Sequence, residues 1–188
     1  MPGEPEIAGL LALMLLHDSR WPARSNDAGV METLENQDRR LWNRQQISDG
    51  VDILKPALAI GLIGSYQIQA AISAVHSEAE SHEATDWDEI ALLYVKLYEL
   101  QPSPIVLLNA AVALSFARNA EAGLGALEEL EQSGELHGYQ PYHAARADLS
   151  RRAGHRESAK AEYRKAIELS GNASQRKFLQ NRLREMGA

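Results

Sequence analysis

The sequence predicts an all-α fold made of antiparallel helical hairpins that stack on one another. Apolar residues recur at helical spacing through most of the 188 residues, and no long stretch alternates as a half-buried strand would. The same spacing of small and large apolar residues also returns along the C-terminal half. A chain of this length can bury a substantial core as one structural domain, and we expect one here.

Residues 1–62 are expected to form an N-terminal helical segment that packs on the array. Residues 5–17 are apolar nearly all round, which predicts a buried helix. A loop follows, and residues 30–42 are ambiguous between a short extended piece and a turn of helix. Asn43 is then a plausible N-cap for a helix that runs to about Ile60, with a kink at Pro56.

The next helical pair begins after Gly64. Ser65 is the predicted N-cap of a helix with apolar residues on one face, and a partner helix follows a long acidic loop and closes at Pro102. The apolar stripes of the two helices are Ile68, Ala71, Ile72 and Val75, then Ile90, Tyr94, Leu97 and Leu100.

Internal repetition extends this pair into an array over residues 63–172. A shift of 36 residues relates Ala147, Ala159, Tyr163 and Ala166 to Ala111, Gly123, Leu127 and Leu130, and a further shift of 33 residues reaches Ile90, Tyr94 and Leu97. Small residues at helix crossings, with a breaker near the end of each pair, are the tetratricopeptide (TPR) pattern, in which each hairpin hides its apolar face on the next. We therefore predict about three TPR-like hairpins, and a capping helix in residues 173–188.

Composition bounds the possible partners. The net charge is −7, although the residues from Arg146 onward carry 11 Lys and Arg against 5 Asp and Glu. A net acidic chain is a poor candidate for direct DNA binding, because phosphate neutralisation supplies most of that affinity. The chain has no cysteine, for which a reducing cytoplasm is the simplest location, and no apolar run long enough to cross a membrane.

One group of charged and aromatic residues is the richest candidate for binding. It comprises Asp18, Arg20, Arg24, Asp38, Arg39 and Arg40, with Trp21 and Trp42. The candidate binding residues are Asp18, Arg20, Arg24, Asp38, Arg39 and Trp42, with Tyr66 and Gln67 from the following helix. Such a group could bind an anionic or peptide ligand, with arginine as a bidentate partner. The favoured alternative is an Arg/Asp network that fastens the long first loop onto the bundle. Gln67 could cap a helix or bridge to that network.

His17 and Asp18 are adjacent, as in the metal-binding pair of HD phosphohydrolases. That chemistry needs further His and Asp ligands on other helices, and the remaining histidines show no paired ligand spacing. A histidine that meets the carbonyls at a helix C-terminus is the favoured interpretation. The sequence also lacks a Gly-rich phosphate loop and a nucleophile elbow. We therefore expect no metal, no cofactor and no catalytic residue.

Several separate stretches carry a resemblance that covers nearly all of the chain. They are GLLALMLLHDSRWPAR at 9–24, NQDR at 36–39 with Trp42, GSYQIQAAISAVH at 64–76, TDW at 85–87, PSP at 102–104 with LNAAVA at 108–113, and HAARAD at 143–148. In these stretches the chain resembles the C-terminal extension of one group of extracytoplasmic-function (ECF) RNA polymerase sigma factors. The genes of that group often lie beside one for a small YCII-like (DGPF) protein.

The resemblance implies a TPR-like regulatory domain that modulates transcription initiation. Its expected partners are the sigma regions in cis, RNA polymerase, or a protein or peptide partner. The two helical regions that bind polymerase and read the promoter are expected upstream of this chain, so promoter recognition is assigned to no residue here. Two other functions stay open: a small-molecule sensor with a pocket between the N-terminal helices and the first hairpin, and an HD-type hydrolase.

Overall fold

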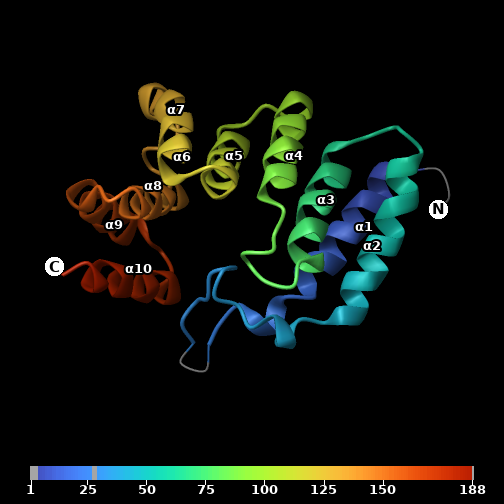
Figure 1. Ribbon diagram of the computed structural model, residues 1–188, viewed down its shortest axis with the longest axis horizontal. Helices are drawn as coiled ribbons and strands as arrows, with labels where there is room; N and C mark the ends of the chain where they lie inside the picture. Colours follow the sequence, from blue (N-terminus) through green and yellow to red (C-terminus); the bar gives the residue numbers. More distant parts are fainter. Residues whose placement is uncertain (1–3, 27–28, 188) are drawn as a thin grey trace. The chain divides into compact units, whose positions relative to one another are not determined.

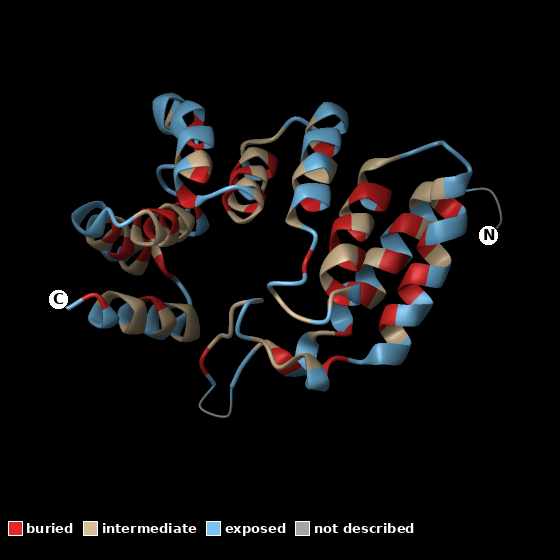
Figure 2. Cartoon of the chain, in the orientation of Figure 1, coloured by how far each residue is buried: buried red, intermediate tan, exposed pale blue. Residues whose placement is uncertain are grey.

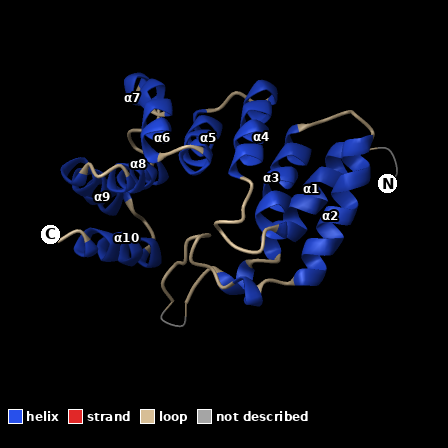
Figure 3. Cartoon of the chain, viewed as in Figure 1, coloured by secondary structure: helices blue, strands red, loops and turns tan. Residues whose placement is uncertain are grey.

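The computed structural model describes residues 4–26 and 29–187, and within these ranges the chain is all-helical, without a β-strand (Figure 3). This confirms the predicted all-α class. The contacts divide the chain into two compact units, described in turn below. Of the described residues, the first unit contains 4–26 and 32–102, and the second contains 29–31 and 103–187.

The first unit is a bundle whose first helix is central. Helix α1 (Pro5–Asp18) packs against both α2 (Arg44–Ala59) and α3 (Ser65–Glu78), and α4 (Trp87–Leu100) packs against α3 (Figure 1). Two short 3-10 turns, η1 (Trp21–Ala23) and η2 (Arg39–Leu41), connect α1 to α2. The core of the unit consists of Ala12, Leu16, Ala23, Trp42, Ile47, Val51, Leu54, Ala70 and Ala74.

The starts of α2 and α3 show how local and distant residues share the capping of helices. The Asn43 side chain accepts hydrogen bonds from the N–H groups of Gln45 and Gln46, both at 3.1 Å, which confirms it as the N-cap of α2. For α3 the N-cap is Gly64, so the prediction of Ser65 was wrong by one residue. The Glu6 carboxylate of α1 instead accepts the N–H groups of the first turn.

Helix α1 departs from the prediction of a helix buried all round. Only Gly9, Ala12 and Leu16 are buried, whereas Leu11 and Met14 are 47% and 60% exposed. Figure 2 shows that buried and exposed positions occur together on the helices of this unit. Gly9 lies so close to α3 that an added Cβ would be 2.7 Å from the Gln67 backbone nitrogen. Small residues therefore make the interface, and the large apolar ones face outward.

The second unit is built from helix pairs. Helix α5 (Pro104–Ala117) packs on α6 (Ala120–Ala126), which is followed by α7 (Glu128–Ser133); α8 (Gln140–Arg152) packs on α9 (Arg156–Leu169), and α10 (Ala173–Glu185) packs on α9. The predicted repeat paired positions that lie 36 residues apart. These positions are buried in the two cores of this unit. At Gly123 an added Cβ would be 2.6 Å from the Ser115 Cβ, so this crossing requires a glycine.

The predicted second helix of this middle hairpin is interrupted. It ends at Ala126 and resumes at Glu128, with Leu127 between α6 and α7. Gly123 and Gly125 lie in the segment, and glycine is a poor helix former because it loses the most backbone entropy on folding. No described helix has the length and apolar character needed to span a bilayer.

Candidate functional site

The eight candidate residues do not form one site, because they lie at opposite ends of α3. Tyr66 and Gln67 are in its first turn, whereas Arg39 contacts its C-terminal end. A helix of 14 residues is about 20 Å long at 1.5 Å per residue. The predicted bridge from Gln67 to the arginines is therefore wrong.

Gln67 joins three elements at the start of α3. It is fully buried, its side-chain oxygen accepts the Gly64 N–H at 2.8 Å, and its side-chain nitrogen donates to the Ala57 carbonyl at 3.1 Å. Because both ends of the amide have protein partners, Gln67 has a structural role, and the capping role that the sequence suggested is confirmed. Tyr66 is 41% exposed beside it, and its backbone N–H donates to Glu6.

At the other end of α3, Trp42 is the centre of a group of cations. Its side chain is 3% exposed and belongs to the core of the unit. The Arg39 Cζ lies 4.5 Å and the Arg20 Cζ 6.0 Å from the centroid of the indole ring. Both arginines are thus within the range of cation–π attraction, and two positive charges share one aromatic ring.

Arg39 also holds the end of α3. Its Nη1 donates to the carbonyls of His76 at 2.8 Å and Ala79 at 2.7 Å. These carbonyls lie at the C-terminus of α3, where the helix has no N–H donors of its own left to pair with them and its dipole favours a cation. Arg39 therefore fastens the first loop to the bundle, as the structural interpretation of the sequence expected, but through carbonyls.

Of the predicted Arg/Asp network, the described residues form one ion pair, between Asp38 and Arg40. Asp38 is the N-cap of η2, and its carboxylate pairs with Arg40 at 2.8 Å; hydrogen bonds from Arg40 lower the pKa of Asp38 to about 2. Asp18 instead accepts a hydrogen bond from the Gln46 side chain at 2.8 Å. Each carboxylate is taken by a near neighbour, so neither offsets the charges of Arg20 and Arg39.

The crowding of cations shifts the pKa values of the group. Burial, with Arg24 and Arg39 nearby, lowers the pKa of Arg20 to about 10. Burial, with Arg20 and Arg39 nearby, lowers the pKa of His76 to about 3, so this imidazole is neutral near pH 7. Its ring packs edge-on against Trp87, with centroids 5.1 Å apart. No local pattern in the sequence indicates that His76 belongs to this group, because it lies 37 positions from Arg39 in the chain.

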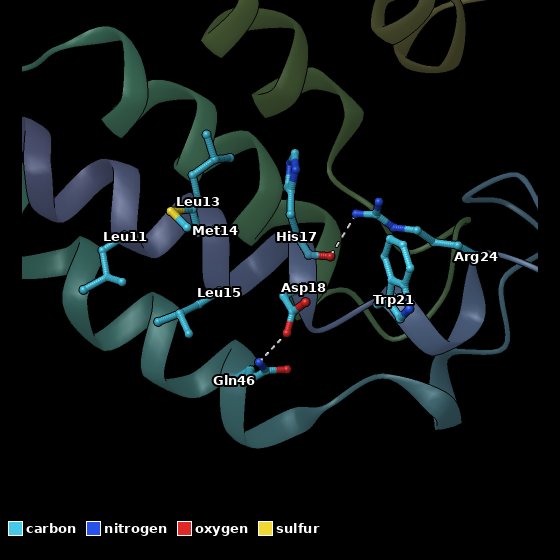
Figure 4. Close-up of a pocket in the computed structure, with 9 residues that line it drawn as sticks. All are labelled: Leu11, Leu13, Met14, Leu15, His17, Asp18, Trp21, Arg24 and Gln46. Atoms are coloured by element: carbon cyan, nitrogen blue, oxygen red, sulfur yellow. Dashed lines mark hydrogen bonds between the residues drawn. The ribbon is translucent and has the colours of Figure 1, made fainter.

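A separate groove runs along the exposed face of α1, with a volume of about 560 Å³ (Figure 4). Most of its lining is apolar, and the polar groups gather at one end: it is formed by Leu11, Leu13, Met14, Leu15, His17, Asp18, Trp21, Arg24 and Gln46. Arg24 lies 5.5 Å from the Trp21 ring centroid and donates to the His17 carbonyl at 3.0 Å. Of the predicted residues, Asp18 and Arg24 belong to this groove.

His17 and Asp18 do not act as a pair. The His17 Nε2 is 3.1 Å from the Ser73 hydroxyl, whereas Asp18 contacts Gln46. Over the described part of the chain, no three His, Cys, Asp or Glu side chains gather as metal ligands. Burial, with Arg20 and Arg24 nearby, lowers the pKa of His17.

Comparison with known proteins adds two findings. Residues 1–58, which contain the α1 groove together with Arg20, Arg39 and Trp42, match a family of unknown function, DUF6596. Over 187 residues, which is the whole chain, the sequence is 44% identical to an uncharacterized protein, R00370, of Rhizobium meliloti (strain 1021). The chain spans 44% of the length of that relative. No solved structure matches.

Proposed function

We propose that this chain is a helical interaction domain of a longer protein, and that it regulates transcription initiation in the manner of the C-terminal extension of an ECF sigma factor. The observation that carries the proposal is the exposed apolar face of α1. Leu11 and Met14 lie one helical turn apart, are about half exposed, and line the groove together with Trp21. Contiguous exposed apolar side chains on a helix mark protein contacts.

Two further observations support the proposal. The relative from Rhizobium meliloti matches this chain throughout and is more than twice as long, which suits a domain that works beside other regions. The helix pairs α5–α6 and α8–α9, with small residues such as Gly123 at a crossing, suit a TPR-like array. The resemblance to ECF sigma factors covers both units.

In this proposal the groove accepts an apolar helix face from the sigma regions or from RNA polymerase. The pattern of a groove lined by leucine and methionine, with polar groups at one end, is that of helix-in-groove recognition. The domain itself contacts no DNA and performs no catalysis, and it acts in the cytoplasm, where transcription initiation takes place.

The test is a binding titration of this chain against the separately expressed sigma regions of a longer homologue and against core polymerase. We expect Met14→Glu to weaken the complex by about tenfold or more, because it places a charge in the apolar contact. Leu92→Glu is the matched control, since Leu92 is a 71% exposed leucine on α4, outside the groove. No binding by the wild type, or equal loss in both variants, would contradict the proposal.

A small-molecule sensor is the second candidate. The groove volume falls in the range of ligand sites, and Arg24 and Asp18 lie at one end, where they could orient a polar group. Saturable shifts of the Leu11 and Met14 methyl resonances by a metabolite, without any binding to sigma regions or polymerase, would favour this candidate.

A further inference from the structure

The group around Trp42 contains three donors that lack an acceptor. The Arg20 Nε, the Arg39 Nη2 and the Trp42 Nε1 are enclosed by the protein and find no hydrogen-bond partner. All three atoms can only donate. Enclosed donors without a partner are rare in folded proteins, because the loss of their hydration is costly. What is missing here is therefore an acceptor.

The same group also lacks negative charge. Throughout the ranges that the structure covers, no carboxylate forms an ion pair with Arg20, Arg24 or Arg39. Glu83 acts on Arg39 as a nearby charge, but it is fully solvated. Among the described residues, the cations beside the buried ring are therefore offset only by the solvated Glu83, which acts on Arg39 without an ion pair. A water molecule could accept a hydrogen bond there, but it would not balance the charge.

We propose that Arg20, Arg39 and Trp42 bind a multiply charged oxyanion, such as the phosphate group of a small molecule. An oxyanion accepts hydrogen bonds at several oxygens, so a single anion can serve more than one of these donors, which belong to two segments of the first loop. Arginine pairs with phosphate through charge-assisted hydrogen bonds. The two positive charges of two guanidinium groups are balanced by a dianion, whereas a single carboxylate would balance only one of them. The site is separate from the α1 groove. A test of anion binding at this site is therefore independent of the interaction proposed for the groove.

The site would make the order of the first loop depend on the ligand. Arg39 already connects η2 to the end of α3, and Arg20 follows α1 directly. An anion held between the two arginines would join these segments in one contact. The ligand class, an oxyanion, is inferred from the unpaired donors and the positive charges of the site.

The test is an NMR titration of the ¹⁵N-labelled whole chain with inorganic phosphate at constant ionic strength, above the second ionisation of phosphate. The indole N–H signal of Trp42, assigned by comparison with Trp21→Phe and Trp87→Phe, should shift and saturate. Sulfate should act like phosphate. Acetate should act much more weakly, and equal binding of acetate would overturn the assignment to a multiply charged anion.

Variants sharpen the titration. Arg20→Gln should weaken phosphate binding by about tenfold, the worth of one charge-assisted hydrogen bond. Arg20 forms no ion pair in the described chain, so this variant is expected to fold, and the dispersion of its spectrum checks that. Arg40→Gln is the matched control, since Arg40 is exposed and pairs only with Asp38. A Trp42 signal that phosphate leaves unmoved, or one that moves equally in Arg20→Gln, would overturn the proposal.

Discussion

Each unit places arginine over a buried aromatic ring, and the two arrangements differ in what neutralises the charge. In the second unit the Arg146 Cζ lies 5.6 Å from the Tyr142 ring centroid, and the guanidinium pairs with Glu131 at 2.8 Å and Glu162 at 3.4 Å. His143 donates to the same Glu162 at 2.7 Å. In the first unit, Arg20 and Arg39 both lie near the Trp42 ring, and no carboxylate of the described residues pairs with either.

The pKa values of the arginines differ between the two clusters in the same way. Burial lowers the pKa of Arg146, but hydrogen bonds with Glu131 and Tyr142 and the charge of Glu162 outweigh it and raise the value above the ordinary one. For Arg20, burial and the neighbouring Arg24 and Arg39 lower the pKa to about 10. Removing one partner of the neutralised cluster leaves a buried charge uncompensated, whereas in the cluster around Trp42 the charges of Arg20 and Arg39 have no paired carboxylate to lose.

The largest effect should come from removing the counter-charge in the second unit. Glu162→Gln leaves Arg146 and His143 without their shared carboxylate, and the three side chains are only 10–20% exposed. We expect the free energy of unfolding of this unit to fall by about 2–3 kcal/mol in urea denaturation. Glu131→Gln, at a 53% exposed side chain, should cost less than about 1 kcal/mol. Equal losses of stability in Glu162→Gln and Glu131→Gln would contradict the view that the buried carboxylate neutralises this cluster.

A smaller loss is expected when Arg39 is replaced by Met. The variant gives up two hydrogen bonds to the carbonyls at the end of α3 but also removes a partly buried charge. The balance should lower the stability of the first unit by about 1–2 kcal/mol in the same measurement. Arg40→Met, at an exposed side chain that pairs only with Asp38, should change it by about 0.5 kcal/mol or less. If Arg39→Met were neutral, the cap on α3 would contribute nothing.

His76 should make the first unit sensitive to acid. Its pKa is about 3 in the folded chain and 6.5 in the ordinary imidazole, so below pH 6.5 the unfolded state binds the extra proton. The stabilising term is complete above pH 6.5 and is lost as the pH falls toward 3, with a slope of at most about 1.4 kcal/mol per pH unit. His76→Phe keeps an aromatic ring against Trp87 and should flatten the fall in stability between pH 6 and 5 by about 1 kcal/mol. An unchanged pH profile would contradict this account of His76.

Local signals in the sequence predicted the elements well. Asn43 could be identified as an N-cap because the capping hydrogen bonds join neighbours in the chain. The sequence also predicted core residues at positions that lie 36 residues apart, and these positions are buried. The prediction was possible because repeated helix pairs bury equivalent faces. The predicted final helix matches α10, and its Leu179 is buried.

Long-range contacts decided the rest. Glu6 accepts the N–H of Tyr66 across 60 positions, and no local pattern shows that Ser65 is displaced as the N-cap. Leu11 and Met14 look like core residues in the sequence, but the close packing of Gly9 turns them outward. Asp38 lies next to Arg39 and Arg40, and only the geometry of η2 decides that its partner is Arg40. The candidate site was therefore located in part, and its missing counter-charge was not foreseen.

The most direct test of the contrast between the two clusters is the unfolding free energy of Arg20→Met, measured with and without phosphate. In phosphate-free buffer the variant should match the wild type within about 0.5 kcal/mol or exceed it, because a buried charge without a partner is removed. In phosphate the wild type should gain stability and Arg20→Met should not. A variant that is about 2 kcal/mol less stable in both buffers would show that Arg20 is a structural residue whose charge the protein already satisfies.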